Sequence, residues 1–163
     1  MSGNPKKPLL CWDSCVFLAW FQKEQDKPLA AIEEMLREIS KDKVSLLVSA
    51  ISFAEVLDRA GGSDAGTQFR QFVKRENIVV ADADTRVASL AAQIRIAGLE
   101  ALAQGKISQG VKIPDALIAA TAVIYHADRL YTFDPVLLEI SGWPVVRGLA
   151  ILPPSAEPSP LGF

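Results

Sequence analysis

The chain has 163 residues, half of them hydrophobic, which is enough to form one domain with a sizeable core. Its 17 Lys and Arg side chains against 19 Asp and Glu give a formal net charge of −2, so it lacks the overall positive charge typical of nucleic-acid-binding domains. Two cysteines and one histidine argue against a four-ligand zinc site.

Short apolar segments alternate along the chain with segments of helical periodicity. In the second of these helical segments, for example, apolar side chains recur at positions 29, 32, 35/36 and 39. Strands are predicted at 9–12, 44–48, 78–80 and 129–132, with an edge strand at either 144–146 or 149–152. Helices are predicted at 14–22, 29–43, 49–59, 67–75, 84–103 and 114–125, with a short one after Pro135 and a loop at 61–66.

This alternation predicts an α/β fold with a central, mainly parallel sheet covered by helices on both faces. We expect residues 1–152 to form one domain and the Pro/Ser-rich segment 153–163 to be a flexible tail. Asp13 interrupts the first apolar run, which also lacks a signal-peptide cleavage site, and the run at 116–125 is too short to span a bilayer. A cytoplasmic location without membrane contact is therefore expected.

Four acidic residues lie where an apolar, strand-like run gives way to a helix-like start. A parallel sheet gathers such junctions at the carboxyl ends of its strands, where ligands of these folds bind. Carboxylates gathered there repel one another unless a cation lies between them, and Mg²⁺ or Mn²⁺ takes oxygen ligands. Such an ion activates water against a phosphodiester bond. The four residues are Asp13, Glu55, Asp115 and Asp134.

Each of these carboxylates also has a purely structural explanation, as a helix cap or a local pair. As a set they are harder to explain in that way, because most lie among apolar residues, where an unpaired carboxylate is costly. Mutual proximity around a cation removes that cost for all four. In the structural alternative, Asp13 and Asp134 cap helices, Asp115 lies in a first helical turn, and Glu55 pairs with Ser52 or Arg59.

These segments resemble the PIN-domain ribonucleases, in particular the VapC toxins of bacterial toxin–antitoxin pairs. The most specific stretch is PDALIAATA with Asp115, which is followed nineteen residues later by Asp134 in the sequence TFD. The segment SAISFAEVL around Glu55 and the apolar-Asp-Ser element around Asp13 complete the family's four acidic positions in the same order. The resemblance covers about residues 9–152.

The resemblance implies a flavodoxin-like three-layer sandwich that cleaves RNA endonucleolytically and leaves 5′-phosphate and 3′-hydroxyl ends. It implies one or two Mg²⁺ or Mn²⁺ ions held by the four acidic residues, with Thr132 and Ser14 as hydroxyls that orient a carboxylate or a water. It also implies a homodimer and a small antitoxin protein that covers the acidic pocket. Cys15 departs from the family, which usually has Asn or Ser there, so one hydrogen bond to the site is expected to be missing.

Two alternatives share this fold: a PIN-like binding module without catalysis, and a nuclease of the same chemistry that cleaves DNA. A phospho-receiver domain is disfavoured, because it needs adjacent acidic residues after the first strand and a lysine near the last. In this chain Ser14 follows Asp13, and no lysine follows Lys112.

Overall fold

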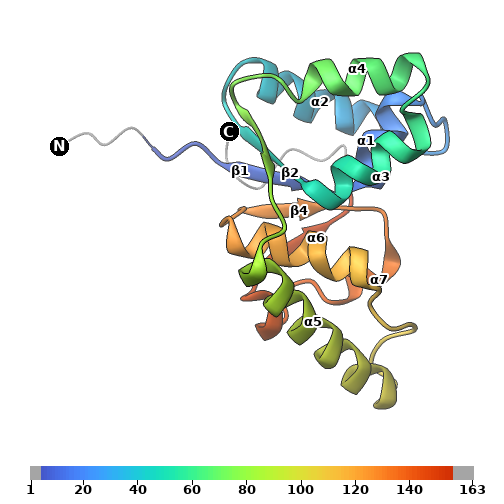
Figure 1. The fold of residues 1–163 in the computed structure, drawn as a ribbon, viewed down its shortest axis with the longest axis vertical. Helices are drawn as coiled ribbons and strands as arrows, with labels where there is room; N and C mark the ends of the chain where they lie inside the picture. Colours follow the sequence, from blue (N-terminus) through green and yellow to red (C-terminus); the bar gives the residue numbers. More distant parts are fainter. Residues whose placement is uncertain (1–4, 156–163) are drawn as a thin grey trace.

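Five parallel strands form the centre of the computed structural model, which describes residues 5–155 (Figure 1). Their spatial order is β3-β2-β1-β4-β5, and every neighbouring pair is parallel. Because the chain moves to one side of β1 first and to the other side later, the carboxyl end of β1 is the switch point where ligands bind in such sheets. The strands are β1 (Leu9–Trp12), β2 (Ser45–Ser49), β3 (Ile78–Ala81), β4 (Arg129–Tyr131) and β5 (Ala150–Leu152).

Helices cover both faces of this sheet, as Figure 1 shows, with α1–α4 on one side and α5–α7 on the other. The three-layer α/β sandwich predicted from the sequence is thereby confirmed, with a sheet that is entirely parallel in the described residues. The helices are α1 (Ser14–Phe21), α2 (Leu29–Ser40), α3 (Ala50–Ala60), α4 (Asp64–Phe72), α5 (Thr85–Ala103), α6 (Ile113–Ile124) and α7 (Pro135–Glu139), with a 3₁₀ turn η1 (Pro144–Val146) before β5.

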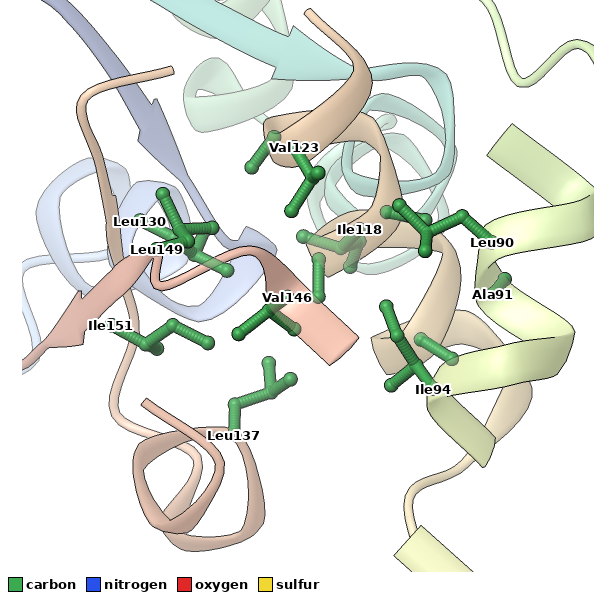
Figure 2. Packing of buried hydrophobic residues seen from close by; sticks show 14 of the residues in the cluster. Leu90, Ala91, Ile94, Ile118, Val123, Leu130, Leu137, Val146, Leu149 and Ile151 are labelled. Atoms are coloured by element: carbon green, nitrogen blue, oxygen red, sulfur yellow. The ribbon is translucent and has the colours of Figure 1, made fainter. Parts of the chain in front are cut away.

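The alternation of side chains along each strand divides the core into two halves. In β1, Leu10 and Trp12 pack with α1–α4, whereas Cys11 faces α5 and α6. The first half contains an aromatic cluster in which the rings of Phe17 and Phe69 lie 5.2 Å apart in an edge-to-face arrangement. Figure 2 shows the second half, where Leu90, Ala91 and Ile94 of α5 pack with residues of α6, α7 and the sheet.

The structure corrects the prediction of a loop over 61–66, because α4 already begins at Asp64. Ser63 caps this helix: its Oγ accepts a bond from the Gly66 amide and donates one of 2.7 Å to the Ala60 carbonyl. Gly66 was a misleading loop signal. Position 66 lies inside α4, and it needs glycine because α4 passes so close to Ala60 that any side chain there would collide with the Ala60 carbonyl oxygen.

At the C-terminal edge of the sheet, the structure decides between the two predicted positions of the last strand. Residues 150–152 pair with β4, while Pro144–Val146 form the 3₁₀ turn. Within residues 5–155, no helix has the length and apolar character needed to cross a membrane. Of the predicted tail at 153–163, residues 156–163 lie outside the described part of the chain, and Pro154 is buried.

Candidate functional site

Asp13 lies at the carboxyl end of β1, where it ends the central strand and begins α1. Its amide extends the pairing with β4 by donating a 2.9 Å bond to the Tyr131 carbonyl. Its side chain is almost fully buried, with 4% exposed, and Oδ1 accepts 2.7 Å and 3.3 Å bonds from the amide and hydroxyl of Ser14. The capping role predicted for Asp13 is therefore real, but it occupies only one carboxylate oxygen.

The second carboxylate oxygen of Asp13, Oδ2, is hydrogen-bonded to Thr132, the residue that follows β4, and to Cys15. Oδ2 accepts a 2.7 Å bond from the buried Thr132 hydroxyl and a 3.4 Å bond from the Cys15 thiol. Burial raises the pKa of Asp13, and the bonds from Thr132, Ser14 and Cys15 partly offset this effect. Thr132 and Ser14, predicted as hydroxyls near the site, both contact this carboxylate.

Asp134 follows β4 and caps α7, as the structural alternative predicted. Its amide donates a 3.0 Å bond to Thr132 Oγ1, so the hydroxyl that holds Asp13 also fixes the turn that carries Asp134. Both capping bonds, from the amides of Val136 and Leu137, end on Oδ1. Asp134 Oδ2 is thereby left for another ligand.

Glu55 lies in the second turn of α3, and its predicted capping box with Ser52 is not formed. Ser49 caps α3 instead, accepting a 3.1 Å bond from the Ile51 amide. Ser52 Oγ and Glu55 Oε1 are buried without a hydrogen-bond partner among the described residues. Burial raises the pKa of Glu55 and the charge of Asp13 raises it further, whereas the Ser14 hydroxyl and the charge of Arg59 lower it. Glu55 therefore lies within electrostatic range of the Asp13 carboxylate.

Asp115 lies in the first turn of α6, and the charges of all three other acidic residues affect its pKa. Its side chain is half-buried, and burial is the largest cause of its raised pKa of about 7. The charges of Asp134, Asp13 and Glu55 follow in that order, while Lys112 acts in the opposite direction. The structure thus places the other three acidic residues singled out in the sequence within electrostatic range of Asp115.

This donor set suits a hard divalent cation, which oxygen ligands hold and which relieves the repulsion among the carboxylates. The buried, unpartnered Glu55 Oε1 is also the kind of atom that an ion or a coordinated water satisfies. In residues 5–155, no three His, Cys, Asp or Glu side chains are already close enough to enclose an ion. An ion at this site would keep several waters, as Mg²⁺ does when one or two carboxylates bind it.

Cys15 is the site residue that sequence reasoning misjudged. The hydrogen bond expected to be missing is present, because the thiol reaches Asp13 Oδ2 and also accepts a 3.3 Å bond from the Phe133 amide. The sequence carried no signal for this role, because Phe133 lies 118 positions from Cys15.

Basic side chains lie next to three of the acidic positions. Arg59 follows Glu55 by one helical turn, and Lys112 immediately precedes the helix of Asp115. Lys27 Nζ lies 5.1 Å from the ring centre of Phe133, the neighbour of Asp134. Although the chain has no basic run, Arg59 and Lys112 lie within electrostatic range of Glu55 and Asp115, and Lys27 lies over the ring of the residue before Asp134.

A known protein family matches the part of the chain that carries the four acidic residues. The PIN domain family model matches residues 10–142, most of the chain and all four acidic positions. The chain belongs to the PIN domain family. Among curated proteins, no sequence matches this PIN domain.

Solved structures of similar fold include toxins and toxin–antitoxin complexes. Three of them are each less than 25% identical to this PIN domain, so the likeness shows a shared fold. A toxin–antitoxin complex from Klebsiella pneumoniae has a TM-score of 0.61 and 16% sequence identity, and the match covers 90% of this chain and 98% of that one. VapBC2 from Rickettsia felis bound to a DNA fragment from their promoter has a TM-score of 0.60 and 16% identity, covering 88% of this chain and 96% of that one. Mycobacterium tuberculosis VapC20, a Sarcin-Ricin loop cleaving toxin, has a TM-score of 0.57 and 15% identity, covering 77% of this chain and 89% of that one.

Proposed function

We propose that this PIN domain is a metal-dependent endoribonuclease and the toxin of a toxin–antitoxin pair. The observation that carries the proposal is the convergence of four carboxylates from separate segments, close enough for three of them to raise the pKa of the fourth. Asp13, Glu55, Asp115 and Asp134 would hold one or two Mg²⁺ or Mn²⁺ ions. When bound, such an ion supplies a Lewis acid that activates water and neutralises charge on the phosphate.

The protein's own groups prepare the site for that chemistry. Thr132 and Ser14 hold Asp13 in one orientation, so its position does not depend on the ion. Asp134 uses Oδ1 for the helix and leaves Oδ2 for a ligand, and Glu55 Oε1 is buried without a hydrogen-bond partner among the described residues. Since no histidine lies in this group, proton transfer from the attacking water would rely on the carboxylates and solvent.

A phosphodiester substrate is supported by the three cations near the acidic residues. A polyanion approaching bare carboxylates would be repelled, and Lys27, Arg59 and Lys112 offset this repulsion with positive charge around the site. RNA rather than DNA is supported by the family resemblance and by the similarity in fold to VapC20, a toxin that cleaves the Sarcin-Ricin loop.

The test is incubation of the purified protein with labelled RNA and labelled DNA, each with Mn²⁺ and with EDTA. Cleavage of RNA in Mn²⁺ only, lost in Asp115→Asn, is the expected result. Cleavage of DNA instead would establish the DNA-directed alternative. Binding of Mn²⁺ without cleavage of either nucleic acid would establish the catalytically silent module.

The toxin assignment also implies protein partners. Several structural neighbours are toxin–antitoxin complexes, which supports a small antitoxin that covers the acidic pocket. A homodimer is supported by apolar side chains on α5 that solvent reaches, Ile96, Leu99 and Leu102, of which Ile96 is 57% exposed. Light scattering should give twice the chain mass, and Leu99→Lys should return the monomer.

A further inference from the structure

Cys15 contacts both chain segments that meet beside Asp13. Its sulfur lies 3.4 Å from Asp13 Oδ2, 3.6 Å from Thr132 Oγ1 and 3.3 Å from the amide nitrogen of Phe133. Asp13 belongs to the junction of β1 and α1, whereas Thr132 and Phe133 belong to the turn between β4 and α7. The thiol therefore connects the segment that carries Asp13 with the segment that carries Asp134.

The number of available hydrogens fixes which atom is the donor in the contact between Cys15 and Asp13. The single hydroxyl hydrogen of Thr132 is donated to Asp13 Oδ2 at 2.7 Å, and Thr132 Oγ1 accepts the Asp134 amide. The hydrogen between Cys15 and these oxygens therefore comes from the thiol, and the carboxylate is its nearer acceptor. The sulfur in turn accepts the Phe133 amide. Cys15 thus acts as donor and acceptor at once.

We propose that Cys15 is a positioning residue that fixes the Asp13 carboxylate relative to the turn between β4 and α7. Its role rests on the proposed function, because the spacing that it sets matters when Asp13 and Asp134 bind an ion together. Removing a group that orients a metal-binding side chain by a hydrogen bond typically lowers metal affinity about ten- to a hundredfold. Cys15 does not itself need to bind the ion.

Two substitutions separate hydrogen bonding from packing. Cys15→Ala removes both the donor and the acceptor, whereas Cys15→Ser restores them on a side chain close in size to Ala. We expect Cys15→Ala to weaken Mn²⁺ binding by roughly ten- to a hundredfold, and Cys15→Ser to recover most of this loss. Cys11→Ala is the control, because it removes the other thiol, which lies in the core and faces α5 and α6.

Two measurements test the proposal, and only one of them depends on metal. Calorimetric titration with Mn²⁺ gives the affinity, and NMR hydrogen exchange of the Phe133 amide reports the bond to Cys15 without any ion. In Cys15→Ala, exchange at Phe133 should become at least about tenfold faster while amides in β2 keep their wild-type rates, because the part-buried Phe133 amide then loses its hydrogen-bond acceptor.

The outcomes distinguish this proposal from the proposed function. Unchanged exchange at Phe133 in Cys15→Ala overturns the positioning role, as does unchanged Mn²⁺ affinity in a protein that binds Mn²⁺. Equal losses in Cys15→Ser and Cys15→Ala overturn it too, because packing would then explain both. If the wild-type protein binds no Mn²⁺ and cleaves no RNA, the proposed function fails, and exchange at Phe133 alone decides whether Cys15 holds the turn.

Discussion

The Thr132 hydroxyl donates a 2.7 Å hydrogen bond to Asp13 Oδ2 across 119 positions of the sequence. Thr132 Oγ1 also accepts a hydrogen bond from the Asp134 amide. One buried side chain therefore orients the Asp13 carboxylate and fixes the start of the turn that carries Asp134. Two of the four acidic residues are therefore positioned in part by the same hydroxyl.

Replacement of Thr132 should affect both activity and stability. Thr132→Ala leaves the buried Asp13 carboxylate and the Asp134 amide without this partner, which should cost about 1–3 kcal/mol of unfolding free energy. RNA cleavage should fall roughly ten- to a hundredfold. Urea denaturation and initial cleavage rates measure the two effects. Thr132→Ser keeps the hydroxyl and should stay near wild type in cleavage; a loss equal to that of Thr132→Ala would show that the methyl group is what matters.

Asp115→Asn should abolish RNA cleavage and leave the fold intact, because it removes a charge and almost no volume. In the absence of metal the variant should be at least as stable as wild type, since a carboxylate repelled by three others is gone. The assay is cleavage in Mn²⁺ together with thermal unfolding in EDTA. Asp64→Asn is the matched control, an exposed acid in the first turn of α4. It should lose a little stability and no activity, and retained cleavage in Asp115→Asn would contradict the metal-site assignment.

The metal-free protein should lose stability as the pH rises from about 4 to about 7. Asp115 has a folded-state pKa of about 7 against 3.8 as its ordinary value, so the native state holds this proton after the unfolded state has released it. The raised pKa values of Asp13 and Glu55 act in the same direction. Urea denaturation in EDTA at several pH values should show this fall, with a plateau above the pKa of Asp115.

Two comparisons check the origin of this pH dependence. Asp115→Asn should flatten the profile, and an equally steep profile in this variant would assign the effect to other groups. Mn²⁺ affinity should rise over the same pH range, because an ion competes with protons for the carboxylates.

Lys112→Ala should weaken RNA binding with little dependence on base sequence, because Lys112 would contact phosphate rather than bases. The dependence of log affinity on log salt should become shallower by about one unit. Binding is measured in EDTA, so that cleavage does not interfere. Lys43→Ala is the control, since Lys43 precedes β2 at the opposite, amino edge of the sheet. Equal losses in the two variants would mean that binding follows net charge alone.

Much of the fold could be predicted because its signals are local. The buried strands β1 and β2 are nearly uninterrupted apolar runs, and such runs between amphipathic helices indicate a parallel sheet. The acidic positions could be predicted for a related reason: strand ends in a parallel sheet meet at one edge. That reasoning needs the order of the elements, and no contact has to be known.

The errors arose where contacts between distant residues decide the outcome. Gly66 is a helical residue that must be glycine because its backbone passes close to Ala60. In the sequence alone, a glycine required by close packing cannot be distinguished from one required by a turn. Cys15 looked like the loss of a polar group, yet the Phe133 amide and the Asp13 carboxylate make a thiol sufficient there. The capping box of Ser52 and Glu55 failed for a local reason instead, because Ser49, three residues earlier, caps α3.

The pairing of β1 with β4 has a consequence for biosynthesis. Asp13 leaves the ribosome early, but the groups that hold it, the Tyr131 carbonyl and the Thr132 hydroxyl, are made more than a hundred residues later. A partly translated chain therefore carries most of the acidic side chains without a competent centre. If the protein cleaves RNA as proposed, its site would form only when the chain is nearly complete.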